Sequence, residues 1–297
     1  MAHIPVLKDE TIDGLAIKSG DIILDGTLGG GGHTAEIVKR FGDTVKIIGL
    51  DLDADALPRA TKALGTMSHD TVFRVAGFQD LDIVLDSLNI PHVDCIMLDF
   101  GISSFQLEDA GRGFSFKKDE PLLMTMQKDP QEGDITAYDI VNKWEETTLA
   151  DIIYGFGEEK FARKIARAIV SARAIEPIET TFDLVDVIDG AVGGAYKRMK
   201  IHPATRTFQA IRIATNRELQ NIEEGIAKGF ARLDKGGRMA LITFHSLEDR
   251  IAKHAFIKFK NEELGHIITK KPIVPSEKEL EENPRARSAK LKNIEKI

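Results

Sequence analysis

Residues 22–34 read Ile-Ile-Leu-Asp-Gly-Thr-Leu-Gly-Gly-Gly-Gly-His-Thr, an apolar run that ends in an acid and passes through a glycine-rich turn. A segment of helical character follows, from about Thr34 to Phe41. Four successive glycines let the backbone turn tightly and let a ligand approach without meeting Cβ atoms. A strand, a glycine turn and a helix in this order predict the first unit of an α/β domain whose turn holds a ligand.

The same alternation continues through the first hundred residues. Apolar runs at 45–51, 72–75 and 93–99 predict further strands, and 55–64 predicts a helix between the first two of them. Short apolar strands that alternate with helices are typical of a parallel sheet covered by helices on both faces.

The pattern changes near residue 107. From 107 to 200 the apolar residues follow helical spacing, and the best helix is predicted over 158–174. A single long helix is then predicted from Pro203 to Phe230, followed by a strand over 238–243. Ser246 with Asp249 predicts a capping box for the next helix, and the charged tail beyond Lys270 is expected to be loosely ordered. We therefore predict a Rossmann-like core at 1–106 and 201–297 that is interrupted by an all-helical insertion at 107–200.

Composition narrows the class of protein. The chain has 297 residues, 42% of them hydrophobic, and a formal net charge of −7. An acidic chain does not coat nucleic acid through bulk charge, although a local basic patch can still bind RNA. The single cysteine, Cys95, excludes an internal disulfide and suits a reducing cytoplasm. No window approaches the ~18 consecutive apolar residues of a membrane span, and the amino terminus does not read as a secretory signal.

The glycine turn suits a nucleoside cofactor. Asp51 ends the second predicted strand, where a carboxylate can accept hydrogen bonds from ribose hydroxyls, and Asp99 ends the fourth at the same edge. A dinucleotide fingerprint needs G-x-G-x-x-G, which no frame of this turn provides. Asp25, Thr27, Gly29 and Gly31 match the looser acidic-x-G-x-G-x-G loop of methyltransferases in part. S-adenosylmethionine is therefore favoured over NAD, and an NAD-dependent oxidoreductase stays open as an alternative.

Seven blocks spread over nearly the whole chain are more specific than the loop alone. They are His3 to Leu7, Asp25 to His33, Leu98 to Gln106, Arg112 to Phe116, Pro203 to Ala210, Phe244 to Arg250 and Asn283 to Lys290. In this order they resemble the RsmH (MraW) family of 16S rRNA cytosine-N4 methyltransferases.

The resemblance implies a class I S-adenosylmethionine-dependent methyltransferase core with a helical insertion. It also implies methylation of the N4 atom of a decoding-centre cytosine near the ribosomal P site. Its partner would be 16S rRNA, within the small ribosomal subunit. Carried over by motif, the cofactor contacts would be Gly31, Gly32, His33, Asp51, Phe78, Asp99 and Gln106.

Several positions depart from the family pattern. Gly77 stands where the family usually has asparagine, Gly26 replaces a usual alanine and Phe105 a usual proline. The largest departure is the segment 121–127, Pro-Leu-Leu-Met-Thr-Met-Gln, where the family generally reads P-L-D-M-R-M-D. Two carboxylates and an arginine are lost there, which puts the substrate or the efficiency of the reaction in doubt.

The chemistry needs help at the acceptor, because the N4 lone pair of cytosine is delocalised into the ring. An enzyme can accept a hydrogen bond from this amine and hold it about 3 Å from the methyl group. We predict Ser103, Ser104 or nearby backbone carbonyls as acceptors, with Phe100 or Phe105 stacked on the base. His245 could orient the base or relay a proton, and for each of these residues a purely structural role is the alternative. No metal is required. Methylation at carbon 5 would need a cysteine nucleophile, and Cys95 lies inside an apolar strand.

Two basic clusters are candidates for contact with RNA phosphates. One is the helical stripe Lys160, Arg163, Lys164 and Arg167. The other joins Arg198 and Arg206 to the tail residues Arg285, Arg287, Lys290 and Lys292. Solvated faces paired with nearby glutamates are the ordinary explanation for both.

Two further functions stay open beside the oxidoreductase. A non-catalytic RNA-binding or assembly factor could retain the cofactor loop, and the altered segment 121–127 favours it. A DNA cytosine-N4 methyltransferase would share the chemistry. The oligomeric state is not predicted.

Overall fold

The computed structural model describes residues 4–109, 111–130, 133–196 and 201–297. The chain divides into two compact units, of which the first comprises Met1–Gly101 and Leu219–Ile297 and the second comprises Ile102–Glu218. The predicted insertion at 107–200 falls within the second unit, which is longer at both ends. His3, which begins one of the quoted motifs, and Arg198, a member of the second basic cluster, lie outside the described residues.

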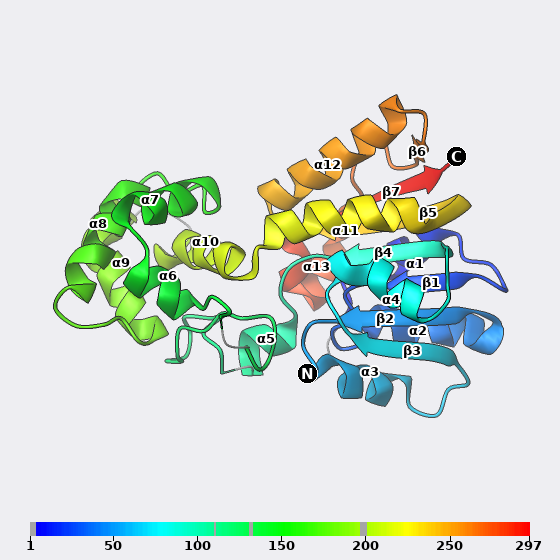
Figure 1. The fold of residues 1–297 in the computed structure, drawn as a ribbon, viewed down its shortest axis with the longest axis horizontal. Coiled ribbons are helices and arrows are strands. Elements are labelled where there is room, and N and C mark those ends of the chain that lie inside the picture. Colours follow the sequence, from blue (N-terminus) through cyan, green and yellow to red (C-terminus); the bar gives the residue numbers. More distant parts are fainter. Residues whose placement is uncertain (1–3, 110, 131–132, 197–200) are drawn as a thin grey trace. The chain divides into compact units, whose positions relative to one another are not determined.

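The first unit is built on a seven-stranded sheet of order β3-β2-β1-β4-β5-β7-β6 (Figure 1). Its strands are β1 Ile22–Asp25, β2 Lys46–Asp51, β3 Asp70–Val75, β4 Val93–Asp99, β5 Leu233–Thr243, β6 Gly265–Ile267 and β7 Lys290–Lys296. The first five are parallel, and β7 pairs antiparallel with both β5 and β6. The predicted α/β fold with a parallel sheet is confirmed. The chain order reverses between β1 and β4, and open α/β sheets bind ligands at the carboxyl ends of such strands.

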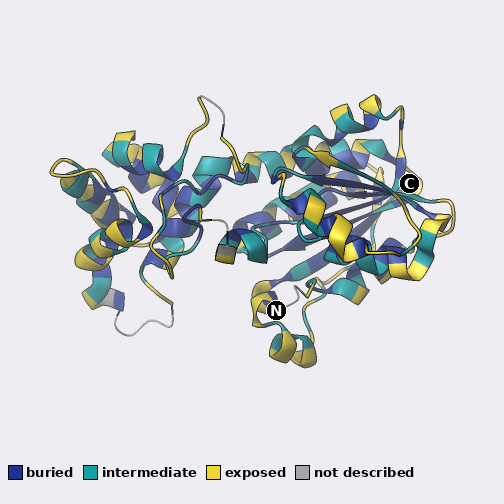
Figure 2. Ribbon diagram, turned by 90° about the horizontal axis from the view of Figure 1, so that it is seen from below, coloured by how far each residue is buried: buried dark blue, intermediate teal, exposed yellow. Residues whose placement is uncertain are grey.

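Helices cover both faces of the sheet because the strand side chains alternate. Leu24, Ile48, Ile96 and Leu241 point to the face packed by α4 Leu81–Ser87, α11 Glu218–Arg232 and α12 Ser246–Asn261. Ile23, Ile47, Met97 and Ile242 point to the other face, which is packed by α1 Lys8–Leu15, α2 Gly32–Phe41 and α3 Ala56–Leu64. Figure 2 shows the strands as the most continuously buried part of this unit.

The second unit is helical and has a core of its own. Its helices are α5 Ser104–Asp109, α6 Ala137–Lys143, α7 Glu146–Gly155, α8 Ala162–Arg173, α9 Thr181–Tyr196 and α10 Ala204–Asn216. Ile140, Leu149, Ile165, Leu184 and Ile211 are wholly buried in its core. Within the described part of this unit, β pairing is limited to an isolated bridge between Pro121 and Thr180.

The prediction of a single long helix from Pro203 to Phe230 is wrong. The chain forms α10 and α11, and Arg217 between them is left-handed with φ 51°. The Asn216 amide donates to the backbone carbonyls of Met124 and Arg212, which ties the end of α10 to another segment of its unit. The apolar spacing continues through the break, so periodicity alone does not show it.

The prediction of a loosely ordered tail is also wrong. Beyond Lys270 the chain forms α13 Glu277–Glu282, a 3-10 turn at Pro284–Ser288 and β7. β7 lies inside the sheet, where Leu291 and Ile294 are wholly buried. Leu291 and Ile294 are three positions apart and face opposite sides of the sheet, so β7 has no alternating apolar pattern that the sequence could reveal. Among the described helices, none combines the length and the apolar character that crossing a membrane requires.

Candidate cofactor and active site

The glycine turn is held against the carboxyl ends of the neighbouring strands. The Gly26 amide donates to Met97 O at 3.0 Å and the Leu28 amide donates to Leu50 O at 2.9 Å. Gly31 has φ 74°, and a Cβ there would lie 2.7 Å from the Cα of Ala60. Only glycine satisfies both the conformation and the space at this position. The turn therefore presents backbone, without side-chain bulk, at the start of α2.

Asp25 closes β1 beneath the turn. It is 1% exposed and accepts hydrogen bonds from Thr34 Oγ1 at 2.6 Å and from the Thr27 amide at 3.1 Å. Burial raises the pKa of its carboxyl to about 7, although both hydrogen bonds oppose that rise. Through these two hydrogen bonds Asp25 holds the glycine turn in its conformation.

Asp51 binds the glycine turn directly. Its Oδ2 accepts the Gly29 amide at 2.7 Å and its Oδ1 accepts the Asp53 amide at 2.8 Å. Burial raises the pKa of this carboxyl, and the two amides partly offset the rise. Each oxygen has a second lone pair, so the carboxylate can also accept from ribose hydroxyls.

Asp99 closes β4 next to β1. Its amide donates to Thr27 Oγ1 at 2.7 Å, which joins the end of β4 to the turn. The Asp99 Oδ1 atom is buried and has no hydrogen-bond partner among the described residues. Burial, together with the charges of Asp25 and Glu248, raises the pKa of this carboxyl well above its ordinary value. A buried acceptor without a donor is unfavourable, so this atom is a strong candidate to receive a ligand N–H.

Phe78 lies beside the turn at the start of a 3-10 turn, Phe78–Asp80. Its ring centroid is 5.6 Å from that of Phe100. A Cβ on Gly225 of α11 would lie 2.4 Å from the Phe78 ring, and one on Gly26 would lie 3.1 Å from Phe78 Cβ and 2.4 Å from Leu98 Cδ2. The glycine that replaces the family's usual alanine at position 26 thus leaves room for these two side chains.

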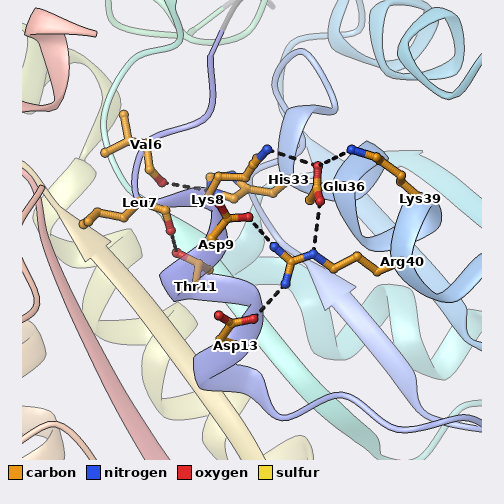
Figure 3. A network of polar contacts seen from close by, with 10 residues as sticks. All are labelled: Val6, Leu7, Lys8, Asp9, Thr11, Asp13, His33, Glu36, Lys39 and Arg40. Atoms are coloured by element: carbon orange, nitrogen blue, oxygen red, sulfur yellow. Dashed lines mark hydrogen bonds and ion pairs between the residues drawn. The ribbon is translucent and has the colours of Figure 1, made fainter. Parts of the chain in front are cut away.

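His33 connects the turn to the amino-terminal segment. Its Nε2 lies 3.0 Å from Val6 O, and the side chain is 8% exposed (Figure 3). A Cβ on Gly32 would lie 2.4 Å from Pro5 Cγ. Residues 5 and 6 therefore pack on the first turn of α2, where both predicted cofactor residues lie.

An ionic network holds α1 against α2 close by. Arg40 pairs with Asp9, with Asp13 at 2.7 Å and with Glu36 at 3.1 Å (Figure 3). Lys8 also reaches Glu36, at 3.1 Å. Three carboxylates around one guanidinium fix the relative position of the two helices.

His245 follows β5 at the same edge of the sheet. It is the N-cap residue of α12 and forms a reciprocal capping box with Glu248, which is wholly buried and accepts the Phe244 amide at 2.7 Å. The predicted cap at Ser246 and Asp249 is wrong by one residue. A histidine with a glutamate three positions later fills the cap because its ring nitrogen accepts the Glu248 amide.

Ser103, Ser104 and Gln106 belong to the second unit, directly after β4 in the chain. The Ser103 amide donates to Gln106 Oε1 at 2.9 Å, and the Gln106 amide donates to Ser103 Oγ at 3.2 Å. Ser104 begins α5. The reciprocal pair fixes the local start of that helix.

Thr27, Thr34 and Gly29 help to form the candidate site although they are not among the predicted cofactor contacts. Thr27 is hydrogen-bonded to Asp99 and to Asp25, Thr34 to Asp25, and Gly29 to Asp51. Their position inside the quoted turn was the available clue. The partners that give them a role come from three different strands.

A comparison with known proteins identifies the family. The model of the MraW methylase family matches residues 1–297. The chain belongs to the MraW methylase family.

Curated relatives agree over nearly the full length. Proteins called ribosomal RNA small subunit methyltransferase H are 46% identical in Clostridium botulinum (strain Kyoto / Type A2) and 44% in Ruminiclostridium cellulolyticum, each over 99% of both chains. The Brevibacillus brevis protein of that name is 42% identical over 99% of this chain and 98% of its own. The oxidoreductase alternative is thereby set aside. A solved chain, a putative rRNA methylase from Clostridium thermocellum, covers all of this chain at 12% identity and a TM-score of 0.48, too low to bear on the fold.

In this MraW methylase, several of the predicted RNA-contacting residues have local partners. Arg206 lies 4.0 Å from the buried Glu159, and Lys290 pairs with Asp249 at 3.1 Å. Lys292 also pairs with Asp249, and Arg167 lies 3.6 Å from Glu146. Arg285 and Arg287 are exposed on the 3-10 turn before β7.

Proposed function

We propose that this chain transfers a methyl group from S-adenosylmethionine to the exocyclic N4 amine of a cytosine in 16S ribosomal RNA. It is a methyltransferase of the class I, Rossmann-like kind, and its full-length relatives are called ribosomal RNA small subunit methyltransferases. The geometric observation that carries the cofactor is the buried, unpartnered Asp99 Oδ1 beside the glycine turn.

The residues at this edge fit that cofactor. Asp51 offers free lone pairs for ribose hydroxyls, and Asp99 Oδ1 can accept an N–H of the adenosyl or methionyl part. Gly31 and Gly32 bring their backbone close, with His33 behind them. Phe78 and Gln106 complete the proposed contacts. When bound, S-adenosylmethionine supplies an electrophilic methyl group on a positively charged sulfur, which buried carboxylates favour.

The acceptor must be positioned and relieved of a proton. Ser103, Ser104 or nearby carbonyls accept a hydrogen bond from the amine and draw its nitrogen toward a pyramidal, nucleophilic form. Phe100 or Phe105 stacks on the base. His245 orients the base or takes the proton that the amine loses.

Nitrogen is the proposed acceptor rather than carbon 5. Carbon-5 methylation of cytosine needs a thiolate nucleophile, and Cys95 is the single cysteine. It is 2% exposed on β4, its Sγ faces Leu15 O at 3.5 Å, and burial raises the pKa of its thiol to about 12. A buried thiol with such a pKa does not attack a base.

The proposed target is a cytosine near the P site of the small subunit, and the proposed compartment is the cytoplasm. Arg206, Arg285, Arg287 and Lys290 are the proposed RNA contacts. No metal enters the proposed reaction.

The decisive experiment identifies the methylated nucleoside. Small-subunit RNA from cells lacking the protein is incubated with the enzyme and labelled S-adenosylmethionine, digested and separated by mass. N4-methylcytidine is the expected product. Label in 5-methylcytidine, or no transfer at all, would refute the proposal. If replacing both Ser103 and Ser104 by alanine left the rate unchanged, their assigned role would fail.

A further inference from the structure

Helix α12 carries an exposed face made of cations. Arg250, Lys253, His254, Lys258 and Lys260 are all exposed, and we call these five residues the α12 cationic face. At 100° per residue they occupy one side of the helix, around the exposed Ile257. The opposite side packs Ala252, Phe256 and Phe259 into the core of the first unit. The face has a fixed backbone, because the helix is anchored beneath it.

The lysines of this face lack counter-ions. Residues 250–261 contain no aspartate or glutamate. Lys253, Lys258 and Lys260 form no ion pair with any residue that the structure describes, whereas Lys290 and Lys292 share Asp249 nearby. An ordinary solvated helix face interleaves both signs of charge at i and i+4. Here acids only flank the face, with Asp249 four residues before Lys253 and Glu262 four residues after Lys258, so residues 250–261 carry one sign of charge although the whole chain is acidic, at −7.

Helix stability does not account for the whole pattern. Cations near the carboxyl end of a helix are favoured by its dipole, which covers Lys258 and Lys260. Lys253 lies near the middle of α12, beyond the end turns where the dipole acts, so the dipole does not explain a cation there.

The face begins beside the candidate site. α12 starts directly after His245, at the carboxyl edge of the sheet where Asp99 pairs in register with Ile242. From Arg250 the face runs about 15 Å along the helix away from that edge. A polyanion whose reacting group lies at the sheet edge can therefore continue along α12.

We propose that the α12 cationic face binds the phosphate backbone of the substrate RNA next to the methylated nucleotide. This inference rests on the proposed function for the identity of the polyanion. RNA is favoured over an anionic membrane because the face is continuous with the site edge and presents one exposed apolar side chain, Ile257, rather than an apolar stripe.

The test compares two triple variants that lose the same charge. The first is Lys253→Gln, Lys258→Gln and Lys260→Gln, in which glutamine preserves helix propensity. The control is Lys62→Gln, Lys235→Gln and Lys278→Gln, three exposed lysines elsewhere on the first unit. Binding to a 16S rRNA transcript is measured without turnover between low and high salt. S-adenosylmethionine affinity is measured by calorimetry in parallel.

Losing three phosphate contacts should flatten the slope of log affinity against log salt by about 2 for the α12 variant. The control should keep the wild-type slope, and all three proteins should bind the cofactor equally. An unchanged slope in the α12 variant, or equal flattening in both variants, overturns the inference. Binding to phosphatidylglycerol vesicles is measured as well. If the α12 variant loses vesicle binding but keeps its RNA binding, the face is assigned to a membrane and the inference is overturned. Wild-type protein that binds RNA but never methylates it would instead defeat the proposed function.

Discussion

Among single residues, the buried carboxyl groups of Asp25, Asp51 and Asp99 are the main feature of the candidate cofactor site. Burial raises the pKa of all three, and they end three neighbouring strands. Buried acids of like charge are unfavourable to folding when ionised. The proposed binding of a positively charged sulfonium at this edge would offset that cost.

The pH dependence of stability follows from Asp25. Its pKa is about 7 in the folded protein and near 3.8 in the unfolded chain. Between these values the folded state holds a proton that the unfolded chain has released. The stabilisation is complete below pH 4 and is lost as the pH rises through 7, at up to about 1.4 kcal/mol per pH unit. In urea unfolding from pH 4 to 8, Asp25→Asn should remove this part of the slope. Identical pH profiles for variant and wild type would contradict the assignment.

Asp99→Asn tests the cofactor contact. Replacing the ionisable acceptor should weaken S-adenosylmethionine binding by about tenfold to a hundredfold, the value of one hydrogen bond to a charged group. The free protein should become more stable, because a buried acid is removed. Calorimetry and thermal unfolding give the two readouts, with the exposed Asp234→Asn as control. Undiminished affinity would rule out Asp99 as a contact.

Among the helices and strands, the first turns of α12 and α2 position residues of the candidate site. His245 and Glu248 cap α12 at the edge where β5 ends, and Arg40 holds α1 against α2, which begins at the glycine turn (Figure 3). The altered segment 121–127 serves packing in the second unit. Leu122 and Met124 are 1% exposed there, and Thr125 O accepts Arg112 Nη1 at 2.9 Å. Leu122 and Met124 keep the residue types of the family pattern, and of the three positions that lose a charge only Thr125 is buried, at 5% exposure.

The end of α1 offers a stability test. Ala16 is exposed and left-handed, with φ 51°, just after the last residue of the helix. Ala16→Gly relieves the Cβ strain and should raise the free energy of unfolding by about 0.5–1 kcal/mol. Ala63→Gly, exposed inside α3, should lower it by a similar amount, about 0.5–1 kcal/mol. Urea denaturation measures both, and changes of equal sign would show that backbone conformation is not the cause.

At the scale of the whole molecule, the last residues of the chain complete the sheet begun by residue 22. β7 lies between β5 and β6 and pairs with β5 over six register positions, from Arg238 with Glu295 to Thr243 with Lys290. Its apolar side chains enter both cores of the first unit, Ile294 on one face and Leu291 on the other. The carboxyl-terminal strand is therefore an interior element.

Truncation tests this arrangement. Removal of residues 290–297 exposes the edges of β5 and β6 and loses two buried side chains worth about 1.5–3 kcal/mol each. Together with the lost ladder bonds, this approaches the whole stability of a domain, about 5–15 kcal/mol. The shortened protein should lack a cooperative thermal transition. Removal of Ile297 alone, which is 60% exposed, should leave the transition nearly unchanged. Cooperative melting of the longer deletion would show that β7 is dispensable.

Features that depend on residues adjacent in the chain could be predicted from the sequence. Strand β4 and the end of β1 agree with their predicted positions because their apolar runs are local, and the glycine turn follows from four adjacent glycines. The helical character of the second unit follows from side-chain spacing in the same way. The motifs also indicated Asp51 and Asp99 at one edge, since the carboxyl ends of parallel strands share an edge.

Features that depend on contacts between residues distant in sequence could not be predicted in this way. It broke the predicted long helix at Arg217, moved the α12 cap to His245 and Glu248, and placed the charged tail inside the sheet as β7. It joined Thr27 to Asp99 across 72 positions and left Asp99 Oδ1 without a donor. Such outcomes arise because hydrogen-bond pairing and burial act between segments that no local pattern connects.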